Sequence, residues 1–217
     1  MSSDYTKIAS NNILPLSISG ELTEAFREWY YTGDMYDHEV ADQVCYLCNK
    51  DDLRYHFKIN NKHTGHSLWV GSICILKFEV PVYEDGQELT HEDAEKKLQA
   101  DKERMRLESC IRALKRVAQK EESGVQDILN NALEYYRKEK ALTPKYAAVV
   151  FWKLNEHNID YSPSFFSIRL RKDKHKEALR NMPTWKVHTF WPALTSQQKK
   201  KSQEMGHEPP AKARENA

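Results

Sequence analysis

The stretch that decides the fold runs from residue 43 to residue 80 and reads QVCYLCNKDDLRYHFKINNKHTGHSLWVGSICILKFEV. It holds Cys45 and Cys48 as a C-x-x-C pair and Cys74 behind a Gly-Ser dipeptide. A C-x-x-C pair serves either metal chelation or dithiol redox chemistry. A redox pair normally opens a helix after a strand, whereas the polar turn 49–52 follows this one. The context therefore favours a zinc knuckle.

The residues between the C-x-x-C pair and Cys74 predict a β-hairpin. Apolar and polar residues alternate over 53–59, which is typical of a half-buried strand. Turn chemistry follows over 60–65, and residues 67–70 form the returning strand. Ser72 then caps a short helix over 73–78, with Cys74 in its first turn. Because a hairpin brings its two ends together, we expect the three thiols to converge.

A closed structural zinc site needs a fourth ligand, which the cysteines do not supply. If the turn is centred near residue 63, His56 pairs close to Cys74, so His56 is the first choice and His66 the alternative. His63 lies at the tip, well over about 15 Å from the knuckle end at roughly 3.3 Å per residue. Cys110 reaches the site only if its helix packs back on it. Three buried thiols without metal, or a redox dithiol, stay open as alternatives.

The order of knuckle, hairpin and helix resembles a treble-clef zinc motif. The resemblance is carried by Cys45-Tyr-Leu-Cys48 and Val70-Gly71-Ser72-Ile73-Cys74-Ile75 and covers about residues 43–80. A usual treble clef has a second helix ligand about three residues after the first, and here Lys77 and Phe78 cannot serve. The module with its charged helical extension is also similar to uncharacterised small proteins of bacteriophages and mobile elements. That likeness implies a non-catalytic role in handling nucleic acid or modulating a host.

The whole chain is expected to be an α+β protein, with a mostly helical part after the zinc module. Outside the module, periodicity and capping residues predict helices over 19–31, 90–122, 144–157, 172–182 and 195–201, and one more that begins at residue 123. The residues 166–171 predict a short strand. The expected organisation is an N-terminal helix plus zinc module over 1–82, a mostly helical domain with a basic C-terminal lobe over 83–202, and a disordered tail over 203–217.

The net charge of +1 hides a strong asymmetry along the chain. Residues 1–100 hold 9 Lys and Arg against 17 Asp and Glu, whereas residues 165–217 hold 12 against 5. Cations follow phosphates and aromatic faces stack on bases, so the basic segment predicts contact with DNA or RNA. The residues expected to make it are Arg169, Arg171, Lys172, Lys174, Lys176, Arg180, Lys186 and Trp185. Alternatively, the segment pairs with the acidic front of the chain or with an acidic partner.

Several function classes find no support in the sequence. No apolar run approaches the roughly 20 residues of a membrane span, and residues 1–10 are unlike a secretory signal, so we expect a cytoplasmic protein without membrane contact. The common nucleotide-binding, hydrolase and metalloprotease motifs are absent. An HNH-type nuclease would use His56 with Asn60 or Asn61, but no histidine lies on the helix after Ser72.

The sequence therefore predicts a non-catalytic accessory or regulatory protein that contains structural zinc and binds nucleic acid. The first alternative is a protein-interaction module, in which the hairpin or the long helix docks a host partner or a second copy of the chain. The second alternative is the HNH-like nuclease.

Overall fold

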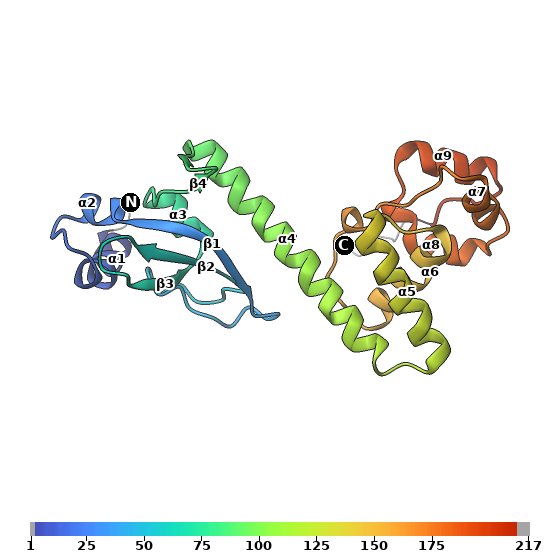
Figure 1. Cartoon of the computed structure of the whole chain (residues 1–217), viewed down its shortest axis with the longest axis horizontal. Coiled ribbons are helices and arrows are strands. Elements are labelled where there is room, and N and C mark those ends of the chain that lie inside the picture. The colour runs from blue at the N-terminus through green and yellow to red at the C-terminus, as the bar shows by residue number, and fades with distance from the viewer. Residues whose placement is uncertain (1–2, 212–217) are drawn as a thin grey trace. The chain divides into compact units, whose positions relative to one another are not determined.

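The structure is a computed structural model that describes residues 3–211. It divides the chain into two compact units, Met1–Arg106 and Leu107–Ala217 (Figure 1). The division falls inside the long helix α4 (His91–Ala118), later than the boundary at 82/83 expected from the sequence. Ala94 and Leu98 of this helix join the core of the first unit, and Cys110 and Leu114 join that of the second. Within residues 3–211, no helix is long and apolar enough to cross a membrane.

The first unit is a small antiparallel sheet with short helices. Its elements are α1 (Ser3–Ile13), the 3-10 helix η1 (Leu14–Leu16), α2 (Leu22–Arg27), β1 (Trp29–Asp37), β2 (Tyr55–Asn61), β3 (Ser67–Val70), α3 (Ser72–Lys77), β4 (Tyr83–Glu84) and β5 (Gln87–Glu88). The main sheet has the order β1-β2-β3. The predicted hairpin is β2 and β3, and the predicted helix after it is α3 with Gly71 rather than Ser72 at its N-cap.

The single helix expected over residues 19–31 is wrong. The helix ends at Arg27, and β1 begins at Trp29 and pairs with β2 from Trp29↔Asn61 to Asp37↔Tyr55. Aromatic residues fit a pleated surface well, and here Trp29 and Tyr31 are buried while Tyr30 between them is less so. The pairing shifts register between Tyr31 and Met35. Tertiary pairing therefore outweighs the helical spacing of the apolar residues.

A buried carboxylate ties the segment before β1 to the sheet. Glu28 accepts hydrogen bonds from the backbone amides of Ile18 (2.8 Å) and Ser19 (2.7 Å) and from Nδ2 of Asn61 (2.9 Å). Burial alone would raise the pKa of Glu28, but the bonds from Asn61 and the two amides outweigh it and hold the pKa below its ordinary value. Asn61, considered above as a nuclease asparagine, is therefore engaged in holding the fold.

Replacing Glu28 with glutamine is expected to cost roughly 1–3 kcal/mol of unfolding free energy at neutral pH, because two amide donors lose a charged acceptor. A carboxylate with a depressed folded pKa stabilises the fold above its unfolded pKa, and that stability is lost as the pH falls through the folded value. The wild type should therefore lose this contribution below about pH 4.5, whereas Glu28→Gln should not. Urea unfolding at pH 7 and in acid measures both effects. The exposed Glu24→Gln is the matched control and should behave as wild type.

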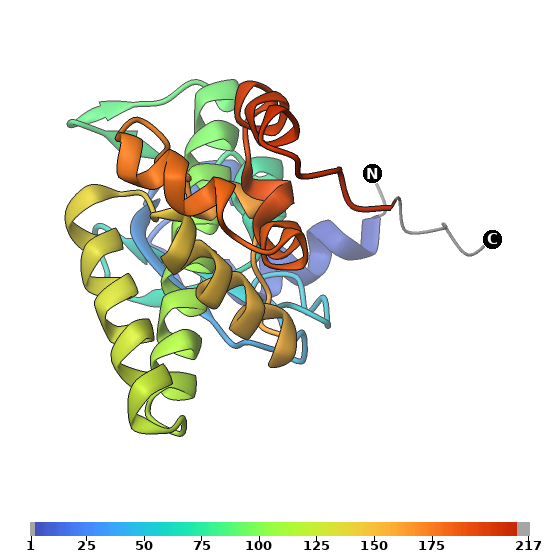
Figure 2. The same ribbon diagram turned by 90° about the vertical axis from the view of Figure 1, so that its right-hand side faces the viewer.

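The second unit is a helical assembly. After α4 it contains α5 (Ser123–Glu139), α6 (Pro144–Glu156), the 3-10 helix η2 (Pro163–Phe165), α7 (Asp173–Arg180), α8 (Thr184–Phe190), the 3-10 helix η3 (Trp191–Ala193) and α9 (Ser196–Glu204). Helix α6 packs against α5, α7 and α8, and these helices face the viewer in Figure 2. Thr143 caps α6 by accepting from the Tyr146 amide, and Pro144 occupies the first turn, as the sequence predicted.

Two expectations for the C-terminal part are wrong. The strand expected over 166–171 is reduced to one parallel bridge between Leu142 and Ile168. Its bridge bonds all involve Leu142, which donates to the carbonyl of Ser167 and accepts from the Arg169 amide, both at 2.8 Å. The tail expected to be disordered from residue 203 is ordered up to the last described residue, 211. His207 is buried there, and its Nε2 donates to the carbonyl of Leu179 at 2.8 Å. Residues 212–217 lie outside the described part of the chain.

Candidate metal centre

The C-x-x-C pair sits on a tight turn closed by backbone hydrogen bonds. The Cys45 amide donates to the carbonyl of Lys50 (2.9 Å), and the Asn49 amide donates to the carbonyl of Cys45 (2.8 Å). Asn49 adopts a left-handed conformation (φ 56°), which asparagine tolerates better than most residues. A bridge between Gln43 and Leu53 closes the base of the loop. Both thiols of the pair are thereby held on one turn.

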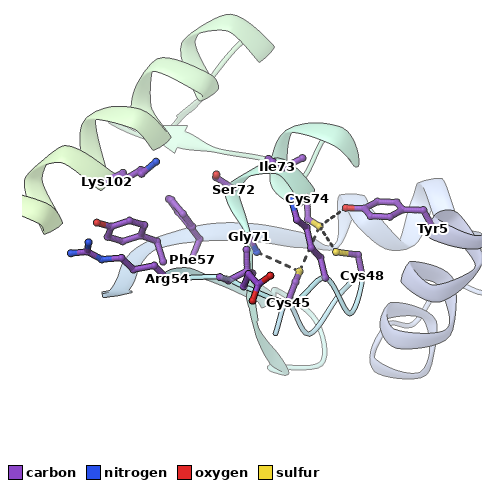
Figure 3. Close-up of a pocket in the computed structure, with 14 residues that line it drawn as sticks. Tyr5, Cys45, Cys48, Arg54, Phe57, Gly71, Ser72, Ile73, Cys74 and Lys102 are labelled. Atoms are coloured by element: carbon purple, nitrogen blue, oxygen red, sulfur yellow. Dashed lines mark hydrogen bonds between the residues drawn. The ribbon is translucent and has the colours of Figure 1, made fainter. Parts of the chain in front are cut away.

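The hairpin delivers the third cysteine to the same place. Phe57 on β2 pairs with Val70, the last residue of β3, and α3 starts two residues later with Cys74 in its first turn. The sulfur of Cys74 lies 3.6 Å from that of Cys45 and 3.3 Å from that of Cys48 (Figure 3). The predicted convergence of the three cysteines is confirmed.

The donor set fits a thiophilic divalent ion such as zinc. The three sulfur atoms lie within 4.8 Å of one another, and the cysteines are free and only 1, 5 and 2% exposed. Zinc–sulfur bonds of about 2.3 Å in a tetrahedron place neighbouring sulfurs about 3.8 Å apart. The two measured separations are within a few tenths of an ångström of that value, so a small outward shift of the thiols would accommodate the ion.

The electrostatics of the thiols also suit a cation. A hydrogen bond from the Cys74 thiol, joined by the amides of Gly71, Cys48 and Leu47, lowers the pKa of Cys45 to about 5 against the effect of burial. The same contact with Cys45, together with burial, raises the pKa of Cys74. The contact between the two sulfurs therefore favours the thiolate form of Cys45 and the protonated form of Cys74. A bound divalent cation removes this conflict, because it stabilises all three thiolates together.

Neither predicted histidine joins the cluster. Successive strand residues face opposite sides of a sheet, and Phe57 lines the cavity beside the sulfurs, so His56 faces the other way. Its Nε2 lies 3.0 Å from the carbonyl oxygen of Val44, and its Nδ1 lies 3.2 Å from Nε2 of His38. His66 is exposed, with Nδ1 against the hydroxyl of Thr64. Both histidines therefore form hydrogen bonds outside the cysteine cluster.

Tyr5 of helix α1 is a neighbour of the sulfurs that the sequence did not reveal. Its hydroxyl lies 3.0 Å from the sulfur of Cys74 (Figure 3). Its ring stacks on that of Phe78, with the ring centroids 5.7 Å apart. The ammonium of Lys77 lies 3.5 Å from the centroid of the Tyr5 ring. Burial, followed by contact with Cys48 and Cys74, raises the pKa of Tyr5, so the phenol keeps its proton and can donate it to a thiolate. No local motif marks Tyr5, because 69 residues separate it from Cys74.

A cavity of about 270 Å³ adjoins the three sulfurs. Of the described residues that line it, Asp52 has the only carboxylate. A carboxylate oxygen or a solvent oxygen can complete a zinc coordination sphere. Asp52 is thus a lining carboxylate, but it is not among the ligand-type side chains that lie within 4.8 Å of all three sulfurs.

A second group of ligand-type side chains does not suit a metal. Glu121, Glu156 and His157 lie within 4.8 Å of one another in the second unit. The ammonium of Lys153 already occupies the space between the carboxylates, at 2.6 Å from each. The cationic lysine would repel a metal ion there. These carboxylates are therefore explained by their ion pairs with Lys153.

Six of the eight residues expected to contact nucleic acid fall in two separate hollows. Arg169, Arg171 and Lys172 line one cleft with Lys201 of α9, whose role the sequence did not indicate. Lys174, Trp185 and Lys186 line a separate groove. Lys176 pairs with Asp173 at 2.6 Å, and the exposed Arg180 lines neither hollow. Phe190 and Trp191, which accompany Trp185 in the sequence, are buried in the core.

Comparison with protein-family models, curated proteins and solved structures finds no match for this chain. The likeness to a treble clef is therefore carried by the sequence motifs and by the geometry of the three cysteines. Function has to be argued from the residues themselves.

Proposed function

We propose that the protein is a non-catalytic nucleic-acid-binding protein whose first unit is stabilised by zinc. The observation that carries the proposal is a cleft of about 620 Å³ in the second unit. Four cationic side chains line it, and the described lining residues include no carboxylate; the cations are those of Arg169, Arg171, Lys172 and Lys201. Several cations that line one cleft attract a phosphate backbone.

The cationic cleft is built on a fixed framework. The Arg169 amide donates to the carbonyl of Leu142 (2.8 Å), which anchors the segment that carries the two arginines. The side chain of Gln198 donates to the carbonyl of Ile168 at 2.6 Å and, through a capping box with Thr195, also closes the start of α9. These bonds hold the segment and α9 together on either side of the cleft. The cations are thus presented on ordered backbone rather than on a loose tail.

Most of these cations are available for an anionic ligand. Arg169 forms an ion pair with Glu139, which orients its guanidinium. Arg171, Lys172 and Lys201 form no ion pair with any residue in 3–211. Lys176 and then Lys201 lower the pKa of Asp173, so the charge of Lys201 is partly balanced by that carboxylate. At Arg171 and Lys172, phosphates would replace counterions from solution.

The distribution of charge between the units supports the same assignment. Residues 107–217 hold 21 Lys and Arg against 13 Asp and Glu, whereas residues 1–106 hold 12 against 19. A cationic unit attracts a polyanion and an acidic one repels it. We therefore assign nucleic-acid contact to the second unit and a structural role to the zinc of the first, where the ion would fasten the knuckle to the hairpin and helix α3.

Binding of duplex DNA and of single strands by the full-length protein, measured by fluorescence anisotropy as salt is raised, tests the proposal. With four phosphate contacts, the logarithm of the affinity for duplex should fall with the logarithm of salt at a slope of about −3.6. Raising salt from about 50 to about 200 mM should then weaken binding roughly 100-fold. The proposal would be contradicted if neither duplex DNA nor single strands bound at low salt. It would also be contradicted if the affinity did not change with salt concentration.

A further inference from the structure

A second hollow in the helical unit differs in chemistry from the cationic cleft. It is a groove of about 1040 Å³ lined by residues of α6, α7 and α8. Trp152 of α6 and Trp185 of α8 lie along it and are 44 and 60% exposed. Tryptophan has a large apolar face, and two exposed faces on one groove form a platform for a planar apolar ligand. We call this groove, which Tyr146 and Met182 also line, the tryptophan groove.

The rim of the tryptophan groove is cationic. Lys145, Lys174 and Lys186 line it, and among the described lining residues the only carboxylate is that of Glu177. The ammonium of Lys186 lies 5.3 Å from the centroid of the Trp185 ring, so charge and aromatic face are presented together. A ligand with planar apolar faces and an anionic backbone matches both features at once.

We propose that the tryptophan groove binds single-stranded nucleic acid, with bases stacked on Trp152 and Trp185 and phosphates near Lys174 and Lys186. The inference rests on the proposed function and adds the strand form of the ligand. In a duplex the bases stack on one another and do not offer their faces, whereas an unpaired strand offers a π-face at every base. The groove would thus favour single strands, while the cationic cleft accepts any phosphate backbone.

The test compares a thymidine oligonucleotide with a duplex of equal length on the full-length protein. Trp152→Ala and Trp185→Ala should each weaken single-strand binding about tenfold, because stacking on an aromatic side chain is lost. Both variants should leave duplex affinity unchanged. Trp185→Phe is the matched control, since it keeps an aromatic face and should retain most of the single-strand affinity. Circular dichroism and thermal unfolding check that the variants keep the fold.

Other outcomes would overturn the inference. Equal single-strand affinity of the wild type and both alanine variants would do so, and so would an equal loss for single strand and duplex. An acidic amphipathic peptide that binds the wild type but not the Trp185→Ala variant, while the oligonucleotide stays bound, would assign the groove to a protein partner. If the same samples still bind duplex in a salt-dependent manner, only the inference about the groove is contradicted. If no nucleic acid binds, the proposed function is contradicted as well.

Discussion

Replacing Cys45 with serine is expected to abolish zinc binding and to destabilise the first unit by several kcal/mol. Hydrogen bonds from the Cys74 thiol and from backbone amides lower the pKa of Cys45, and its sulfur accepts from the Gly71 amide at 3.4 Å. Loss of one thiolate leaves Cys48 and Cys74 as an incomplete donor set. Structural zinc binds zinc-finger peptides with about 10–16 kcal/mol, and that energy becomes folding energy when the unfolded chain lacks the site.

Zinc content after dialysis and thermal unfolding measure the effect of Cys45→Ser. Hydrogen exchange should locate it, with faster exchange in β2, β3 and α3 and no change in the helices of the second unit. The matched control is Cys110→Ala, because Cys110 is buried in the core of the second unit and should have no part in metal binding. A chelator should reproduce the loss in the wild type and leave Cys45→Ser unchanged. Full zinc retention by Cys45→Ser would rule out the three-cysteine site.

The double variant Arg171→Gln, Lys172→Gln is expected to weaken duplex binding about 60-fold near 0.1 M salt. Each lost phosphate contact removes about 0.9 from the salt slope, which corresponds to roughly an eightfold loss of affinity at that salt concentration. The slope itself should fall by about 1.8. Both side chains are exposed and unpaired with residues in 3–211, so the fold should tolerate glutamine at both positions.

Lys199→Gln, Lys200→Gln is the matched control for the cleft. It removes the same charge from the same C-terminal segment, but neither lysine lines the cationic cleft. Its affinity and salt slope should stay close to those of the wild type. Equal losses in the two double variants would show that the protein responds to overall charge rather than to the cleft.

The hairpin and the cluster of three cysteines could be predicted because their signals are local. Alternation over 53–59 and the position of Cys74 after Gly71 and Ser72 determine a hairpin that returns to Cys45. Strand β1 was missed because the aromatic residues around Trp29 satisfy a helical period as well as a strand. Only the pairing of Trp29 with Asn61, which is far away in the sequence, decides between a helix and a strand.

The surroundings of the metal centre were harder to predict because they depend on side-chain direction and on distant contacts. The hairpin register brought His56 to the correct end of the sheet, but its side chain points to the opposite face and bonds to Val44 and His38. Tyr5 reaches Cys74 through the packing of α1, which no short motif encodes.

The basic segment shows the same limit in the second unit. Its net charge could be counted from the sequence, but the sequence could not tell that Trp185 is exposed while Trp191, six residues later, is buried. Nor could it tell that Lys201 joins Arg171 and Lys172 in one cleft, because this depends on how α9 folds back on residues 168–172.

We propose that Cys45, Cys48 and Cys74 hold a zinc ion. Elemental analysis of the purified, untagged, full-length protein by mass spectrometry tests it most directly, with circular dichroism on the same sample to show that the chain is folded. We predict about one zinc per chain, bound through dialysis. A folded protein that contains no zinc would contradict the account.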